Sequence, residues 1–119
     1  MSSGIKLDER SILQAFIDLK VSEVIAKIYI YLVKVGGATS KQIIEGTKLY
    51  PSAVRKALSQ MYHEGFVKRI KLSNDRVGRK PFLFKPASPK EVMDRLMIRV
   101  KERFQKLQYL NQYFEKRKD

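Results

Sequence analysis

The chain has 119 residues, of which 44% are hydrophobic, and this length and composition suit one globular domain rather than a disordered segment. Its 25 Lys and Arg against 12 Asp and Glu give a formal net charge of +13, which favours a polyanionic partner, nucleic acid before an anionic membrane surface. The absence of Cys excludes disulfides and thiolate chemistry, and without a signal peptide or membrane-spanning run we expect a cytoplasmic, nucleoid-associated protein.

The positive charge is concentrated in the middle of the chain. Residues 39–89 carry eleven Lys and Arg against three Asp and Glu, whereas residues 1–38 carry five against four and residues 90–119 carry nine against five. If the basic residues served only to keep the surface solvated, they would not need to be concentrated in one segment. We therefore expect the middle segment to contact the polyanion.

Two helices are predicted before residue 36. Asp8–Leu19 has acidic residues in its first turn and apolar residues at helical spacing, so residues 1–19 form an N-terminal helical segment. Ser22 is typical of an N-cap, and the helix after it has an apolar stripe with further apolar residues, including Val33, on its sides. We expect this second helix to be the core helix, buried on more than one face. Its stripe is Ile25, Ile28, Leu32 and Val35.

The next two predicted helices are short. Thr39 with Gln42 three residues later is typical of a capping box, which opens a helix over about residues 40–45. Pro51 suits the first position of the following helix, and Gly65 suits the position just past its end. Two short helices joined by a few residues including Gly are typical of a helix-turn-helix.

The second short helix, about residues 51–64, has one apolar face and one polar face. Its polar face carries hydroxyls, amides and cations, which are the groups that contact phosphates and base edges. His63 lies on this exposed face with no Cys or clear carboxylate partner, so we assign it no catalytic or metal-binding role. No glycine-rich phosphate loop, nucleophile elbow or metal motif occurs, so we expect no enzyme activity, no cofactor and no metal. The inward residues are Val54, Ala57, Leu58 and Met61.

Two runs rich in β-formers follow, FVKRIKL and PFLFK, separated by the turn-rich loop SNDRVGRK. A plain β-hairpin with a solvated tip would explain this segment in isolation. Directly after a helix-turn-helix, we interpret it as a basic wing over about residues 66–85, with Arg76, Arg79 and Lys80 in its loop.

The last segment predicts one long helix from Ser88, an N-cap, to about Lys116. Apolar residues recur at alternating spacings of four and three, which is a heptad seam, with a single Asn at one of its positions. A helix of this length cannot bury the whole seam against so small a domain, so we expect it to form a homodimer. The two helices of the dimer could run parallel or antiparallel. The alternative is a helix that folds back on its own domain. The seam is Met93, Met97, Val100, Phe104, Leu107, Asn111 and Phe114.

The chain resembles archaeal winged helix-turn-helix regulators through SEVIAKIYIYL with GGATSKQI, then YPSAVRKALSQMYHEGFV, then GRKPFLFKPASPKEVMDRL. It is similar to the DNA-binding domain of the TrmB-like family and to the small, basic, Lrs-like regulators of crenarchaea. The resemblance implies that Pro51–Glu64 is the recognition helix, that the loop around Arg76 to Lys80 is the wing, and that the final helix dimerises. TrmB-like proteins often continue into a sugar-binding domain; with one helix in that place, the resemblance does not extend to sugar sensing, and no small-molecule effector is evident in the sequence.

We therefore expect a mainly α fold with a small β-hairpin, in which a winged helix-turn-helix domain (20–87) precedes a long dimerisation helix (88–119). The expected function is a homodimeric, sequence-specific transcriptional regulator that binds double-stranded DNA and no membrane. An architectural DNA-binding protein with little sequence preference and a winged-helix protein-interaction module are the alternatives. The predicted DNA contacts are Tyr50, Ser52, Arg55, Lys56, Ser59 and Gln60 in the recognition helix, Lys41 and Gln42 in the preceding helix, and Arg76, Arg79 and Lys80 in the wing.

Overall fold

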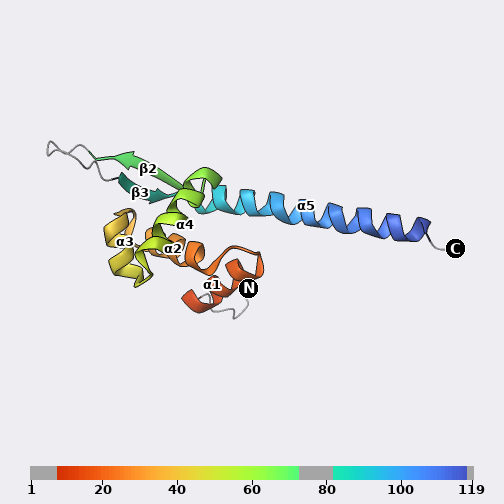
Figure 1. Ribbon diagram of the computed structural model, residues 1–119, viewed down its shortest axis with the longest axis horizontal. Coiled ribbons are helices and arrows are strands. Elements are labelled where there is room, and N and C mark those ends of the chain that lie inside the picture. The colour runs from red at the N-terminus through yellow and green to blue at the C-terminus, as the bar shows by residue number, and fades with distance from the viewer. Residues whose placement is uncertain (1–7, 73–81, 118–119) are drawn as a thin grey trace, which may run out of the picture. The chain divides into compact units, whose positions relative to one another are not determined.

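The computed structural model describes residues 8–72 and 82–117 (Figure 1). The chain divides after Ala87 into two compact units, residues 1–87 and residues 88–119. The second unit is the helix α5 (Pro89–Lys116). The elements of the first unit are α1 (Glu9–Asp18), α2 (Glu23–Val35), β1 (Ala38–Thr39), α3 (Ser40–Thr47), α4 (Pro51–Glu64), β2 (Val67–Lys71) and β3 (Phe82–Pro86).

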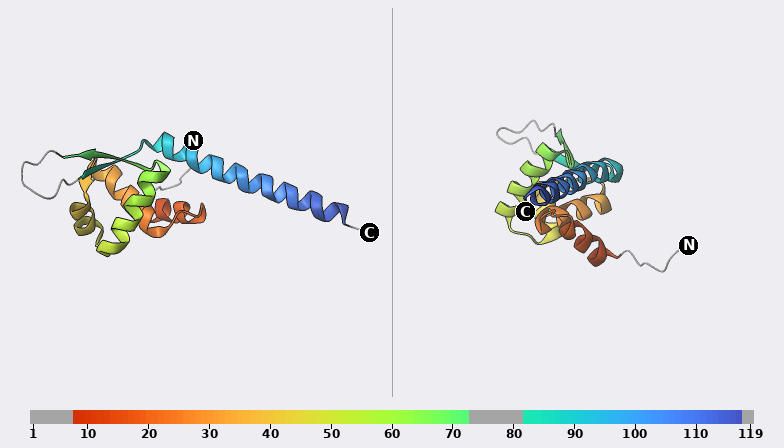
Figure 2. Two further views of the ribbon diagram at one scale, coloured as in Figure 1. Left: turned by 45° about the horizontal axis from the view of Figure 1, so that its top comes forward. Right: turned by 90° about the vertical axis from the view of Figure 1, so that its right-hand side faces the viewer.

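The core of the first unit is built around α2, which packs against α1, α3, α4 and β3 (Figures 1 and 2). Ile28 and Leu32 have no exposed surface, as the predicted stripe requires. The prediction is wrong for Val35, which is 49% exposed, and Val33 is 47% exposed. Rotation around the helix does not explain this exposure, because at 100° per residue Val35 lies only about 20° from the buried Ile28. Val33 and Val35 both lie in the last turn of α2, which ends at Val35.

The helices begin at side chains that cap them. Asp8 is the N-cap of α1 rather than its first residue, and its carboxylate accepts the backbone N–H of Ser11 at 2.8 Å. The predicted capping box at α3 is confirmed: the Thr39 hydroxyl accepts the Gln42 N–H at 3.2 Å, and the Gln42 side-chain oxygen accepts the Thr39 N–H at 2.9 Å.

α3 is two residues longer than predicted and contains Gly46 in its last turn. A Cβ on Gly46 would lie 2.3 Å from Cε1 of Tyr31 on α2, so only Gly allows α3 to approach the tyrosine ring this closely. The Tyr31 hydroxyl also donates to the Gln42 carbonyl at 3.4 Å. The Tyr31 side chain therefore lies directly against the first helix of the helix-turn-helix.

The β structure is a three-stranded antiparallel sheet in the order β1-β3-β2. β3 is central: Phe84 pairs with Ala38 of β1 on one side and with Arg69 of β2 on the other. The mainly α fold with a small hairpin is confirmed, but the third strand was not predicted, because two residues are too few to show alternation. β1 ties the start of α3 to the hairpin.

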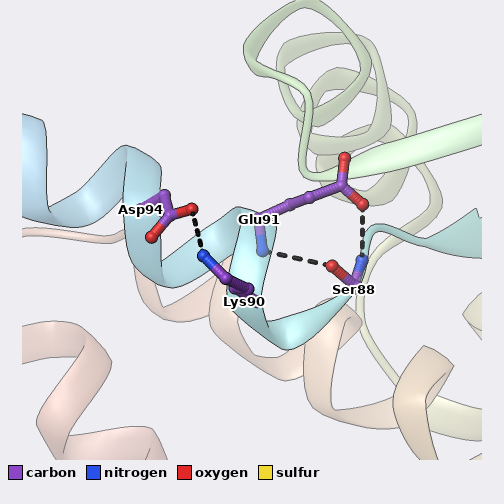
Figure 3. A network of polar contacts seen from close by, with 4 residues as sticks. All are labelled: Ser88, Lys90, Glu91 and Asp94. Carbon is purple, nitrogen blue, oxygen red and sulfur yellow. Dashed lines mark hydrogen bonds and ion pairs between the residues drawn. The ribbon is translucent and has the colours of Figure 1, made fainter.

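α5 is a helix of 28 residues. Its first turn holds a second capping box, in which Ser88 and Glu91 exchange hydrogen bonds of 3.1 and 3.2 Å, and Lys90 pairs with Asp94 at 3.1 Å (Figure 3). No helix in the described parts of the chain combines the length and apolar character needed to cross a membrane.

Candidate nucleic-acid interface

α4 has the bounds and the buried face that the sequence predicts. Pro51 occupies its first position, and Gly65 follows its end in the left-handed conformation at φ 80°. Because four apolar residues anchor one side of α4 in the core, its other side is held outward. The buried residues are Val54, Ala57, Leu58 and Met61.

All predicted contact residues of the helix-turn-helix are exposed, but their surroundings differ. Arg55 and Ser59 line a groove between α4 and the sheet. Gln60 donates a hydrogen bond to Glu64 at 3.3 Å, and the side-chain oxygen of Gln42 is used in the capping box. The remaining exposed residues are Lys41, Tyr50, Ser52 and Lys56.

The groove between α4 and the sheet has a volume of about 390 Å³. Leu58 and Phe84, both buried, contribute apolar surface, while Arg55, Ser59 and His63 line it from α4. Ser40, the first residue of α3, also lines it. The described residues of its lining include no Asp or Glu, so the groove carries positive charge and hydrogen-bond donors.

Arg69 of β2 lines the same groove and was not among the predicted contacts. Its guanidinium carbon lies 4.0 Å from the ring centroid of Tyr62 on α4 and 4.6 Å from that of Phe82 on β3. Strand alternation in β2 could have indicated this position, because Arg69 lies two residues from the buried Val67 and shares its face of the sheet. Its aromatic partners, Tyr62 and Phe82, come from other elements, so the sequence around Arg69 gives no sign of them.

Arg76, Arg79 and Lys80, the predicted wing contacts, lie outside the described residues. Among residues 8–72 and 82–117, no group of three or more His, Asp and Glu side chains is arranged to hold a metal ion. The chemistry available at this face of the first unit is therefore hydrogen bonding, positive charge and aromatic stacking.

The α5 seam, the seven residues predicted for the dimer interface, is exposed in the single chain. The exposure of its apolar members ranges from 41% at Val100 to 64% at Leu107 and Phe114. Every described residue from Val100 onward is exposed. The remaining seam residues are Met93, Met97, Phe104 and Asn111.

Residues 13–90 match the model of a protein family described as sugar-specific transcriptional regulator TrmB. The chain belongs to the TrmB family. It is a transcriptional regulator of the winged-helix type, and the resemblance noted in the sequence is confirmed. No curated protein sequence matches the chain.

Three solved structures share the fold at low sequence identity. A possible transcriptional regulator from Methanosarcina mazei Go1 superposes with a TM-score of 0.71 at 13% identity, covering 95% of each chain. TrmBL2, described as an archaeal chromatin protein with a novel mode of DNA binding, gives 0.73 at 14% identity, covering 92% of this chain and 39% of its own. The ST1889 protein from Sulfolobus tokodaii gives 0.62 at 16% identity, covering 80% of this chain and 97% of its own.

Proposed function

We propose that this TrmB-family chain is a homodimeric regulator that binds specific sites on double-stranded DNA and acts at the nucleoid. The observation that carries the proposal is the outer side of α4, which is held outward by a buried apolar face and presents cations, hydroxyls and an amide. In this proposal α4 enters the major groove, and the wing, with Arg76, Arg79 and Lys80, contacts the backbone or the minor groove.

The N-terminal half of α4 is proposed to read bases. Ser52, Arg55 and Lys56 lie in its first two turns, and Arg reads guanine through two parallel hydrogen bonds. Ser59 and Gln60 would share base and phosphate contacts, while neighbouring exposed residues position the helix against the backbone. Those neighbours are Lys41, Gln42 and Tyr50.

The α5 seam is proposed as the dimer interface. Apolar side chains that are 41–64% exposed along one helix are removed from water when a second helix covers them. Asn111 at one seam position would fix the register of the helix pair at some cost in stability. A two-fold dimer predicts an inverted-repeat binding site, with half-sites one helical turn or a multiple of it apart.

The substitution Arg55→Ala tests the role of α4. We expect a loss of about 1–3 kcal/mol of binding free energy on a duplex selected by the wild-type protein, with relaxed preference at one base pair. Arg10→Ala on α1 removes the same charge away from α4 and serves as the control. Binding titrations with the selected duplex and its single-base variants provide the measurement; unchanged affinity and preference in Arg55→Ala would remove Arg55 from the interface.

A second candidate function is an architectural DNA-binding protein with little sequence preference. It is favoured by the net charge of +13 and by the structural similarity to TrmBL2, an archaeal chromatin protein. Phosphate contacts alone produce binding that is strong at low salt and independent of sequence. The ratio of affinities for a selected duplex and an arbitrary duplex at one salt concentration separates the two functions, because a ratio near one supports the architectural role.

A further inference from the structure

Arg69 is held in place by two aromatic rings that belong to different elements. Tyr62 projects from α4 and Phe82 from β3, and the guanidinium of Arg69 lies within cation–π distance of both. Stacking uses the faces of the guanidinium plane and leaves the N–H donors at its edge. In the described part of the chain no carboxylate is paired with Arg69. Its charge and its donors are therefore available to a ligand.

The other donors of the groove come from one side of α4. Arg55, Ser59 and His63 follow each other at spacings of four along the helix, so they form a row beside Arg69. The guanidinium of Arg69, the hydroxyl of Ser59 and the imidazole of His63, with no acidic residue among the described lining, suit an extended anion. A row of phosphates has this chemistry.

We propose that this groove holds one sugar–phosphate strand of DNA and that Arg69 is a positioned phosphate ligand. The inference rests on the proposed function: with α4 in the major groove and the hairpin at the adjacent minor groove, the strand that separates the two grooves crosses the gap between α4 and the sheet. Arg69 emerges from the sheet, away from the outer side of α4, and contacts the backbone without reading bases. Tyr62 and Phe82 are positioning residues that act through Arg69.

The substitution Arg69→Gln tests this assignment. Binding is measured by fluorescence anisotropy on a selected duplex and on an arbitrary duplex, each about 30 base pairs long to hold two half-sites. We expect an affinity loss of about tenfold on both duplexes, because a phosphate ligand carries no sequence information. Between about 50 and 200 mM salt, the slope of log K against log salt should decrease by roughly 0.9 for each phosphate that the variant no longer neutralises.

Lys85→Gln is the matched control for charge. Lys85 neighbours Phe84 on β3, and strand alternation places it on the opposite face of the sheet from Arg69. The control removes the same charge from the same sheet, so it should leave the affinity within about twofold of wild type. An equal loss in both variants would mean that general charge, rather than the groove, attracts DNA, and would overturn the proposal.

The positioning role of Tyr62 is tested in a double-mutant cycle. Tyr62→Leu should weaken binding severalfold, Tyr62→Phe should preserve it, and Tyr62→Leu should add little in the Arg69→Gln background. Arg69→Lys keeps the charge without the planar stack, so it should retain the salt slope while losing part of the affinity. Thermal unfolding of each variant shows that the fold is intact.

The outcomes separate this proposal from the proposed function. If Arg69→Gln binds both duplexes as the wild type does, the groove assignment fails, while base reading by α4 stands or falls with Arg55→Ala. If Arg69→Gln loses affinity only for the selected duplex, Arg69 reads bases and the assignment also fails. If the wild-type protein binds neither duplex, both proposals fail together.

Discussion

The first unit and α5 differ in what covers their apolar side chains. In the first unit Ile28, Leu32 and Met61 have no exposed surface, so this part of the chain provides its own core. On α5, Phe104 is 58% exposed and Leu107 is 64% exposed. A continuous exposed stripe of this kind is typical of an association surface rather than of a finished fold. The first unit therefore buries its apolar side chains within the chain, whereas the α5 seam is left exposed to a partner such as the proposed second copy.

A charged side chain in the α5 seam should have the largest effect, because it would disrupt the proposed dimer while leaving the first unit folded. Leu107→Asp would bury an unpaired carboxylate in each half of the proposed helix pair, at a cost of several kcal/mol. We expect sedimentation at micromolar concentration to show a monomer, with DNA binding lost at concentrations that saturate the wild type and the first unit still folded.

Gln105→Asp introduces the same side chain on α5 away from the seam, because residue 105 lies at the position following Phe104 in the heptad. This control should remain dimeric. A dimeric Leu107→Asp protein would show that the seam is not the interface.

Gly46→Ala should weaken the first unit and leave α5 unaffected. In an ordinary helix interior this change stabilises by about 1 kcal/mol, but here the new Cβ would lie 2.3 Å from Cε1 of Tyr31. We therefore expect a loss of about 1–3 kcal/mol in the free energy of unfolding measured with urea. The dimer should persist in sedimentation below the unfolding transition.

Removing the ring that opposes Gly46 provides the control. In a Tyr31→Ala background the clash is absent, so Gly46→Ala should be neutral or stabilising there. Destabilisation of equal size in both backgrounds would show that the ring contact is not the cause.

The smallest expected effect concerns the first turn of α1. Hydrogen bonds from the backbone and side chain of Ser11 hold the pKa of Asp8 below its usual value. A carboxylate with a lowered pKa stabilises the folded state above its usual pKa, and that contribution is lost as the pH falls through the lowered value. We expect the protection factor of the Ser11 amide, which compares its exchange rate with that of an unstructured peptide at the same pH, to fall as the pH decreases below about 4.

Asp8→Asn tests this pH dependence, because the amide oxygen caps the helix without titrating. The variant should show no acid-dependent loss of protection at Ser11. The same acid profile in both proteins would assign the effect to another group.

The sequence predicts elements well where single residues mark their ends. Pro51 and Gly65 bound α4 because one suits the first helical position and the other adopts the left-handed conformation after it. Ser88 marks the start of α5 in the same way. These boundaries depend on local geometry, so a sequence pattern is enough to place them.

The sequence does not predict features that depend on contacts between distant elements. A glycine at residue 46 predicts the end of α3, but the ring of Tyr31 explains why a glycine is needed inside the helix. In the sequence Arg69 contributes only charge, since its two aromatic partners come from α4 and β3. β1 gains its strand geometry from pairing with β3, which lies more than forty residues away in the sequence.

β1 also determines how rigidly the proposed reading surfaces are mounted. Because β3 pairs with β1 and β2, the start of α3 and the hairpin are joined through one sheet, and α4 packs against both α3 and β2. These contacts hold the spacing between α4 and the hairpin constant. In the proposed function one duplex contacts both, and any bending or groove narrowing needed to fit this spacing costs an energy that depends on the sequence of the duplex. We therefore expect the proposed complex to discriminate between duplexes by their stiffness as well as by their base edges.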